Sequence, residues 1–494
     1  MFYWLRLSFI CIIFSFFASA AVAHVEHTGL SSPKQDCKIV IIGGGPAGLY
    51  SALRLGPKYG SQVCLFEREN RLGGRLYDVA RDPVANPNGP YMGIGGRRVI
   101  EGQTVLFNLA KELNITLDNP AVEAELTQTQ GKVAVNKNDL LFLYPNLKGP
   151  FGEDAESELL NQLLASPERK NIDSYASFSD YATTVIGVDG FKYLHDMSRF
   201  RADFEYPINA RSYIDYLAEE INVCCKIYYP VGGMSAFIRA MEAHARASGV
   251  QIFINEGVNS IDKQGAEYKV ATAHRIVVSP RLIIAVPPLA LEKINGTIAK
   301  KITDQAQFKA MMAVKVTTVA QWYDEPWWKN IRTKDGRIVW RGTTTDHCIN
   351  SVEIPQEAYS AQQNVIRAVY NDKLSCVEQW KKLAAKGEDA LEAEVHKGLQ
   401  QLLANNGLTQ AVSIPKHASK TVYHLWNDGW YFQHADSKFT NQEIADWALA
   451  PLPGEQIGLA SEGYNPQRSG WSDGAYKSAI RLLNNQYGME LQTN

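Results

Sequence analysis

The residues with the clearest chemical use in this sequence are a run of glycines that an acidic residue follows. The run, Gly43–Gly48, has the pattern G-x-G-x-x-G, and Glu67 stands 19 positions after its last glycine. In such a site Gly43 allows a tight turn, Gly45 lets the main chain approach a pyrophosphate, and Gly48 lets a helix pack on a strand. The carboxylate accepts hydrogen bonds from ribose hydroxyls. The spacing therefore predicts a dinucleotide site.

The elements that must position these residues are a strand, a helix and a second strand. Residues 38–42, a lysine followed by four apolar, β-branched residues, precede the glycines and predict a buried strand. A helical pattern covers 49–55, and residues 62–66 predict the next strand, which ends at Glu67. The amide groups and the dipole at the start of the helix would face the phosphates. This spacing does not separate FAD from NAD.

A glycine doublet that follows Glu67 favours FAD. The segment Arg71–Arg75 reads Arg-Leu-Gly-Gly-Arg. Its paired glycines expose main-chain amides, and Arg75 adds positive charge for a phosphate. Here the chain resembles the flavin amine oxidase superfamily, in which such a doublet lies beside the FAD pyrophosphate. The resemblance implies FAD as the cofactor.

Further segments resemble the same family in the same order along the chain. Tyr229–Met234 contains a second glycine pair and precedes a predicted helix at 235–247, and the family's adenine contact then falls at Val258. Near the C-terminus, Glu462 matches the acid that binds the flavin ribityl chain. The helix expected around Ala475 would point its N-terminus at the flavin, where its dipole stabilises negative charge on the reduced ring.

The glycine pattern and the resemblance together name the expected cofactor contacts. They are Gly43, Gly45, Pro46, Ala47, Gly48, Glu67, Arg68, Gly74, Arg75, Gly95, Gly96, Arg97, Val258, Glu462, Trp471 and Ala475. No cysteine lies between Trp426 and Gly470, where monoamine oxidases attach their flavin, so FAD is expected to bind non-covalently. No Cys-x-x-Cys or Cys/His spacing typical of a metal site occurs, and no metal is expected.

Within this family, the substrate class depends on residues beside the flavin. Residues 92–99 fall where the family's second flavin-contacting loop lies, and Arg98 matches the arginine with which L-amino-acid oxidases hold the substrate carboxylate. A guanidinium is a planar fork that binds a carboxylate in bidentate geometry, whereas it repels an ammonium group. Arg97 is the alternative ligand, and a salt bridge or an FAD contact is the alternative role of Arg98.

The same resemblance places three more residues at the substrate. Tyr359 is the expected second ligand of the carboxylate, the carbonyl of Gly470 would accept from the amine, and Trp471 would shape the side-chain pocket. Aromatic residues at 426–432 form a cluster on a predicted strand, with core packing as the alternative role. Thr318 stands where many members carry a lysine that holds a water near the flavin. This lysine and its water are therefore expected to be absent or to lie elsewhere.

The first 23 residues predict an export signal. Arg6 precedes about a dozen apolar residues, and Ala21–Ala23 fits an A-x-A cleavage site. An uncleaved membrane anchor is the alternative, although the apolar run is short for a span of about 20 residues. The mature protein is therefore expected to be secreted or periplasmic.

The cysteines are expected to meet an oxidising compartment after export. Cys37 and Cys64 fall in or beside predicted buried strands, where a free thiol acting as a small hydrophobe is expected. A disulfide through Cys224 or Cys225 is an alternative that remains open.

Length and composition agree with interleaved globular domains. The 494 residues are 45% hydrophobic and 21% charged, a composition that excludes a disordered chain. The net charge is -2, and the sequence has neither the basic excess nor the basic runs typical of a nucleic-acid-binding protein. We expect an α/β protein with a discontinuous Rossmann-like FAD-binding domain, an α+β substrate domain and a helical lobe. The expected ranges are 1–23 for the signal peptide, 36–100, 225–318 and 440–490 for the FAD-binding domain, 101–149 and 319–439 for the substrate domain, and 150–224 for the lobe.

These observations predict an oxidase most like the L-amino-acid oxidases, which converts an L-amino acid to a 2-oxo acid with release of ammonia and hydrogen peroxide. The expected partners are a small amino acid or amine and molecular oxygen, without nucleic acid and, after removal of the signal, without membrane. A homodimer is left open. An amine or polyamine oxidase is the first alternative and would require an acidic pocket. A flavin-bearing binding protein without turnover is the second.

Overall fold

The fold comes from a computed structural model of the chain. It describes residues 35–82, 84, 91–120, 124–147, 149, 151–221, 226–329, 331–344, 347–354, 364–403, 408, 412–466 and 470–493. The predicted export signal at 1–23 lies outside these ranges, and so do Tyr359, Cys224 and Cys225. Within them, no helix combines the length and the apolar character needed to cross a bilayer.

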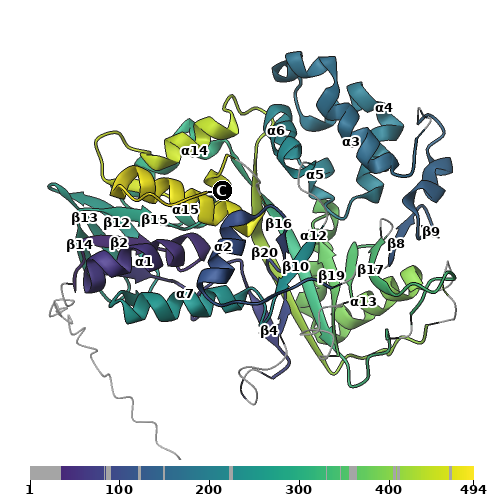
Figure 1. The fold of residues 1–494 in the computed structure, drawn as a ribbon, viewed down its shortest axis with the longest axis horizontal. Coiled ribbons are helices and arrows are strands. Elements are labelled where there is room, and N and C mark those ends of the chain that lie inside the picture. Colours follow the sequence, from purple (N-terminus) through teal and green to yellow (C-terminus); the bar gives the residue numbers. More distant parts are fainter. Residues whose placement is uncertain are drawn as a thin grey trace, which may run out of the picture.

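The predicted dinucleotide site belongs to a body built on a five-stranded parallel sheet (Figure 1). Its strand order is β11 (Gln251–Phe253), β3 (Val63–Phe66), β2 (Ile39–Ile42), β15 (Leu282–Ile284) and β21 (Ile457–Leu459). Three helices cover one face: α1 (Pro46–Tyr59), α7 (Ser235–Ala247) and α15 (Ser472–Tyr487). A four-stranded sheet covers the other face, with β1 (Gln35–Asp36), β14 (Ile276–Ser279), β13 (Glu267–Thr272) and β12 (Val258–Gln264).

Strand β2 shows why the chain forms these layers. Successive side chains of a strand point to opposite faces of its sheet. Ile39 and Ile41 pack with the helices, whereas Val40 and Ile42 pack with the four-stranded sheet. All four side chains are buried, as an apolar, β-branched strand between two covering layers requires.

The second body is a seven-stranded sheet beside the first (Figure 1). Its order is β20 (Lys420–Gln433), β16 (Met311–Trp322), β19 (Val365–Asn371), β18 (Ser351–Glu353), β17 (Val339–Thr344), β8 (Ala124–Thr129) and β9 (Lys132–Ala134). Helices α12 (Leu374–Lys386) and α13 (Glu388–Leu403) pack on it through Val319 and Trp380.

A helical lobe packs on the same sheet through Val314, Val316 and Trp430. Its helices are α3 (Ala155–Ala165), α4 (Phe178–Met197), α5 (Ala202–Glu205) and α6 (Ala210–Ile221). Helix α3 begins at Ala155 and α6 ends at Ile221, so these helices fall within the range 150–224 expected for the lobe. Figure 1 shows the lobe above the second sheet.

The expectation that Cys37 and Cys64 are free thiols is wrong, because they form a disulfide. Cys37 precedes β2 and Cys64 lies in β3, and the two strands are neighbours in the parallel sheet. This pairing puts their Cα atoms 5.8 Å apart, within the range of a disulfide. A lone strand pattern does not reveal which positions of two strands meet.

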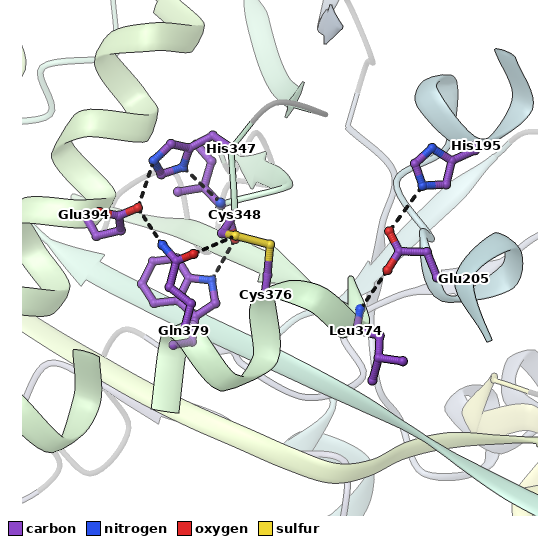
Figure 2. The surroundings of a disulfide bond; sticks show 10 residues. His195, Glu205, His347, Cys348, Leu374, Cys376, Gln379 and Glu394 are labelled. Atoms are coloured by element: carbon purple, nitrogen blue, oxygen red, sulfur yellow. Dashed lines mark hydrogen bonds and ion pairs between the residues drawn. A yellow bond between two sulfur atoms is a disulfide. The ribbon is translucent and has the colours of Figure 1, made fainter. Parts of the chain in front are cut away.

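A second disulfide, between Cys348 and Cys376, joins the segment before β18 to α12 (Figure 2). Their Cα atoms are 5.5 Å apart. On the lobe side of this junction, the amide of Leu374 donates to Glu205 of α5 at 2.9 Å. The disulfide therefore lies where the second sheet, α12 and the lobe meet.

Candidate active site

The start of helix α1 forms an open cradle. Gly45 is its N-cap and no side chain caps the helix, so the first amide groups are available to a ligand. A Cβ added to Gly45 would meet nothing within 4 Å. The glycine doublet lies against this point, since Gly73 donates to the carbonyl of Gly44 at 2.8 Å and a Cβ on Gly74 would lie 3.3 Å from the Cα of Gly45. Such a cradle fits a pyrophosphate.

Two glycines of the run are required by close approach within the protein. Gly43 has a φ of 105° and donates to the carbonyl of Phe66 at 2.8 Å. A Cβ on Gly48 would lie 1.9 Å from the carbonyl oxygen of Gly43, so only glycine lets the helix pass so close to the turn. The predicted roles of these two positions therefore have a steric basis.

Glu67 ends β3 beside the same turn. Its Oε2 accepts from the amide of Gly44 at 2.7 Å and its Oε1 accepts from the amide of Glu69 at 2.8 Å. Both oxygens keep a further lone pair, which suits a ribose hydroxyl. The next residue, Arg68, pairs with Glu69 at the surface, and its aliphatic part lies beside Gly257, just before Val258 begins β12.

An ion pair joins the segment of the glycine doublet to the C-terminal cofactor segment. Nη1 of Arg75 lies 2.9 Å from Oε2 of Glu462, and Oε1 of Glu462 accepts from the amide of Gly470 at 2.6 Å. Burial works against the charged guanidinium, but Glu462 and Asp428 outweigh it and raise the pKa of Arg75. These groups, 387 residues apart in sequence, thus meet at one site.

The loop that carries the predicted substrate arginine lies directly on Arg75. The amide of Gly96 donates to the carbonyl of Arg75 at 3.0 Å, and a Cβ on Gly95 would lie 2.0 Å from the same oxygen. The carbonyl of Ile94 accepts from Thr318 Oγ1 and from Trp426 Nε1, each at 2.9 Å. Thr318 therefore supports this loop, and no lysine is among the described residues that line the cavity there.

A cavity of about 340 Å³ connects the cofactor segments with the second sheet and the lobe. At the cofactor end it is lined by Pro46, Arg75, Gly95, Gly96, Glu462, Gly470, Trp471 and Ala475. Further in, its wall includes Thr318, Trp426 and Trp430. The lobe contributes Phe200, Phe204, Tyr213, Tyr216 and Leu217. The expected cofactor end and the expected substrate region therefore share one cavity.

Four arginines also line this cavity: Arg97, Arg98, Arg199 and Arg367. The guanidinium of Arg98 forms an ion pair with Glu353, and Nη2 of Arg367 lies 2.7 Å from Oε2 of the same carboxylate. Arg97 joins them at 2.9 Å, so its guanidinium faces Glu353. The salt-bridge alternative for Arg98 is thus present, while the side chain still lies on the cavity wall.

The arginine cluster carries more positive charge than its glutamates balance. Burial, together with the repulsion of Arg199, Arg367 and Arg97, lowers the pKa of Arg98 to about 9. Burial and the neighbouring arginines likewise lower the pKa of Arg367 to about 9. Arg199 is 3.7 Å from Glu125. Such a wall favours an anionic group in the cavity.

Sequence reasoning missed Glu353, Arg199 and Arg367. Arg367 stands in the apolar strand β19, and a charged residue within a buried strand is a signal that it has a partner or a ligand. Glu353 gives the same signal at the end of β18. Arg199 lies between α4 and α5 and has no such pattern around it. Tyr359, the expected second carboxylate ligand, lies outside the described residues.

The open helix start, the acid after β3 and the Arg75–Glu462 pair define a FAD-dependent oxidoreductase of two interleaved bodies. Residues 46–482 match the family of flavin containing amine oxidoreductases, and the chain belongs to that family. The expected fold class and the FAD cofactor are thereby confirmed.

The proteins to which this chain is similar include achacin, an amine oxidase and a putrescine oxidase. Achacin of Lissachatina fulica is 25% identical over 350 residues, which are 62% of this chain and 64% of achacin, less than two thirds of its length. Amine oxidase [flavin-containing] A of Sus scrofa is 40% identical over 77 residues, 16% of this chain and 14% of that protein. A solved structure of a putrescine oxidase double mutant superposes with a TM-score of 0.66 at 17% identity, covering 92% of this chain and 100% of that one. This last likeness shows the fold alone.

Proposed function

We propose that the protein is an L-amino-acid oxidase, which forms a 2-oxo acid, ammonia and hydrogen peroxide from an amino acid, oxygen and water. The observation that carries the proposal is the cavity wall of Arg98, Arg199 and Arg367. Their glutamate partners also serve Arg97 and Arg341, so positive charge is in surplus there. A substrate carboxylate relieves this surplus, whereas the ammonium of a simple amine is repelled.

The chain's own residues bind and orient the substrate in this proposal. A guanidinium has five donors, so Arg98 can keep Glu353 and still donate to a substrate carboxylate. Trp426 and Trp430 exclude water beside the reacting carbon, and the carbonyl of Gly470 accepts from the neutral amine. Bound FAD, held by the cradle at Gly45 and by Glu462, supplies the two-electron acceptor. Fixed geometry lowers the entropic part of the barrier.

Peroxide release tests the proposal most simply. The FAD-loaded protein is assayed with the twenty L-amino acids and with the amines that their decarboxylation yields. We expect turnover of at least one amino acid and a kcat/KM for the related amine at least ten-fold lower. Turnover of amines alone would contradict the proposal, and binding without any turnover would favour a flavin-bearing binding protein.

An amine oxidase is the second candidate, because two acids line the lobe side of the cavity, in addition to Glu462 at the cofactor end. Asp203 and Glu156 both belong to the lobe side of the wall. However, Asp203 accepts from the hydroxyl of Tyr213 at 3.0 Å, and Glu156 is paired with Lys137. Because both carboxylates already have these partners, the structure favours an amino acid over a simple amine as the substrate. The amine arm of the assay separates the two candidates.

We further propose that the protein is exported and that its FAD is non-covalent. Two disulfides support export, because such bonds persist in oxidising compartments. We expect the mature N-terminus of the secreted protein to follow Ala23, as N-terminal sequencing measures. Acid precipitation of the holoprotein should leave the flavin in the supernatant; flavin in the pellet would contradict non-covalent binding.

A further inference from the structure

A row of alternating charges crosses four neighbouring strands of the second sheet. Glu125 of β8 is directly opposite Arg341 of β17, Arg341 is opposite Glu353 of β18, and Glu353 is opposite Arg367 of β19. Residues directly opposite each other on neighbouring strands have side chains on the same face, and opposite charges there attract. The row therefore places Glu353 between two arginines at a fixed register.

Glu353 is also the point where the loop of the first body meets this row. Arg97 and Arg98 reach it from the loop that lies on Arg75, and Arg367 reaches it along the sheet. The carboxylate is 1% exposed, and it is not among the residues that line the cavity. Because it is buried among guanidinium groups and away from the cavity, it has no access for proton transfer from a substrate.

We infer that Glu353 is a positioning residue that holds Arg98 and Arg367 at the cavity wall with their free donors facing the substrate carboxylate. The inference rests on the proposed function, since it explains how that carboxylate is recognised. Three arginines this close repel one another and lose solvation. A single shared carboxylate lets them stay charged and fixes their planes, whereas without it they separate or release protons.

Other charged and titratable groups around the cluster cannot replace Glu353. Arg97 lies over the ring of Tyr229 at 4.8 Å, and Arg367 over the ring of Tyr370 at 4.7 Å. Burial raises the pKa of Tyr370 far above its usual range, so this phenol stays neutral. Beyond it, Asp372 accepts from the amide of Arg201 at 2.9 Å.

The remaining charged neighbours either are cations or already bind other partners. Arg199 approaches from the lobe and adds positive charge. Its partner Glu125 also binds Arg341 through a second ion pair. Asp78 accepts from the amide of Ser235 at 2.6 Å. Glu353 is therefore the carboxylate that Arg98 and Arg367 share.

Benzoate tests the inference, because it has a carboxylate but no amine that titrates near neutral or alkaline pH. Its binding to the FAD-loaded protein is followed through the flavin absorbance, as a function of pH, in the wild type, Glu353→Gln and Glu353→Asp. Glu112→Gln is the matched control, since Glu112 forms a surface pair with Arg54. Steady-state kinetics with an amino acid and its decarboxylated amine accompany the titrations.

For Glu353→Gln we expect the Kd of benzoate and the KM of the amino acid to rise at least ten-fold. The amine should keep its kcat/KM within about two-fold. A guanidinium group binds benzoate only while it is protonated, so binding is lost as pH rises through the pKa of the arginines. This loss of binding at alkaline pH, the alkaline limb, should move to lower pH in Glu353→Gln. Glu353→Asp keeps the charge with a shorter reach, so it should weaken benzoate while leaving that limb in place.

Two results would overturn the inference while the proposed function stands. One is an unchanged Kd and an unchanged limb in Glu353→Gln; the other is an equal loss for amino acid and amine. If Glu353→Gln does not fold, Glu353→Asp decides, and an unchanged benzoate Kd in that variant refutes the positioning role. A wild type that neither binds benzoate nor oxidises an amino acid would instead refute the proposed function.

Discussion

Replacement of Arg98 by methionine measures how much of substrate binding depends on a carboxylate. Methionine keeps most of the volume and removes the charge. Glu353 remains paired with Arg97 and Arg367 in this variant, so the fold keeps its buried carboxylate balanced. We therefore expect a folded protein with its FAD in place, as the flavin spectrum and the melting temperature measure.

The size of the effect follows from the burial of the site. Truncation of one partner of a buried charged pair costs about 2–5 kcal/mol. Because Arg199 and Arg367 stay on the cavity wall and continue to attract the carboxylate, we expect the lower end, about 2 kcal/mol. At about 1.4 kcal/mol for each factor of ten, this is a roughly 30-fold loss of kcat/KM for the amino acid.

The related amine is the internal comparison, and Arg337→Met is the control protein, since Arg337 lies at the surface in a pair with Asp335. The amine should react as well with Arg98→Met as with the wild type, or better, because a repelling charge is gone. Peroxide release with both substrates over a range of concentrations separates KM from kcat. Equal losses for amino acid and amine would refute the reasoning.

Three further predictions concern the cradle, the disulfide and a buried acid. Gly45→Ala should lower FAD content by at least ten-fold with an unchanged melting temperature of the apoprotein, because its Cβ has room in the protein but enters the cradle; full FAD content would contradict this. Replacing Cys348 and Cys376 by serine opens a loop of 28 residues and should cost about 3–4 kcal/mol in urea unfolding; an unchanged midpoint would contradict it. Burial raises the pKa of Asp372 to about 7, so its contribution to stability is present below about pH 4 and lost as pH rises through 7. Asp372→Asn should flatten the melting temperature over that window, and an unchanged slope would refute the assignment.

Local patterns were sufficient for the first part of the cofactor site. Gly43, Gly48 and Glu67 belong to one continuous unit of strand, turn, helix and second strand, so their spacing alone predicts where they lie. Helix α7 has the predicted ends, 235–247. Glu462 was reached only through resemblance, because its contact with Arg75 spans most of the chain.

The substrate half depends on strand order, which a single sequence does not reveal. Glu353 and Arg367 meet because β18 and β19 are neighbours in a given register, and a shift by one residue would separate them. The same reason hid the pairing of Cys37 with Cys64. Arg98 was found through its position in the family resemblance, but its partner was not.

Anaerobic reduction of the flavin tests the central claim most directly, because it measures electron transfer from the substrate without any dependence on oxygen. The FAD-loaded wild type is mixed in a stopped-flow instrument with an L-amino acid or with the amine that its decarboxylation yields, and the flavin absorbance is followed. The account predicts bleaching by at least one amino acid, with an apparent second-order rate at least ten times that of its amine. Bleaching by amines alone, with no amino acid active, would contradict it.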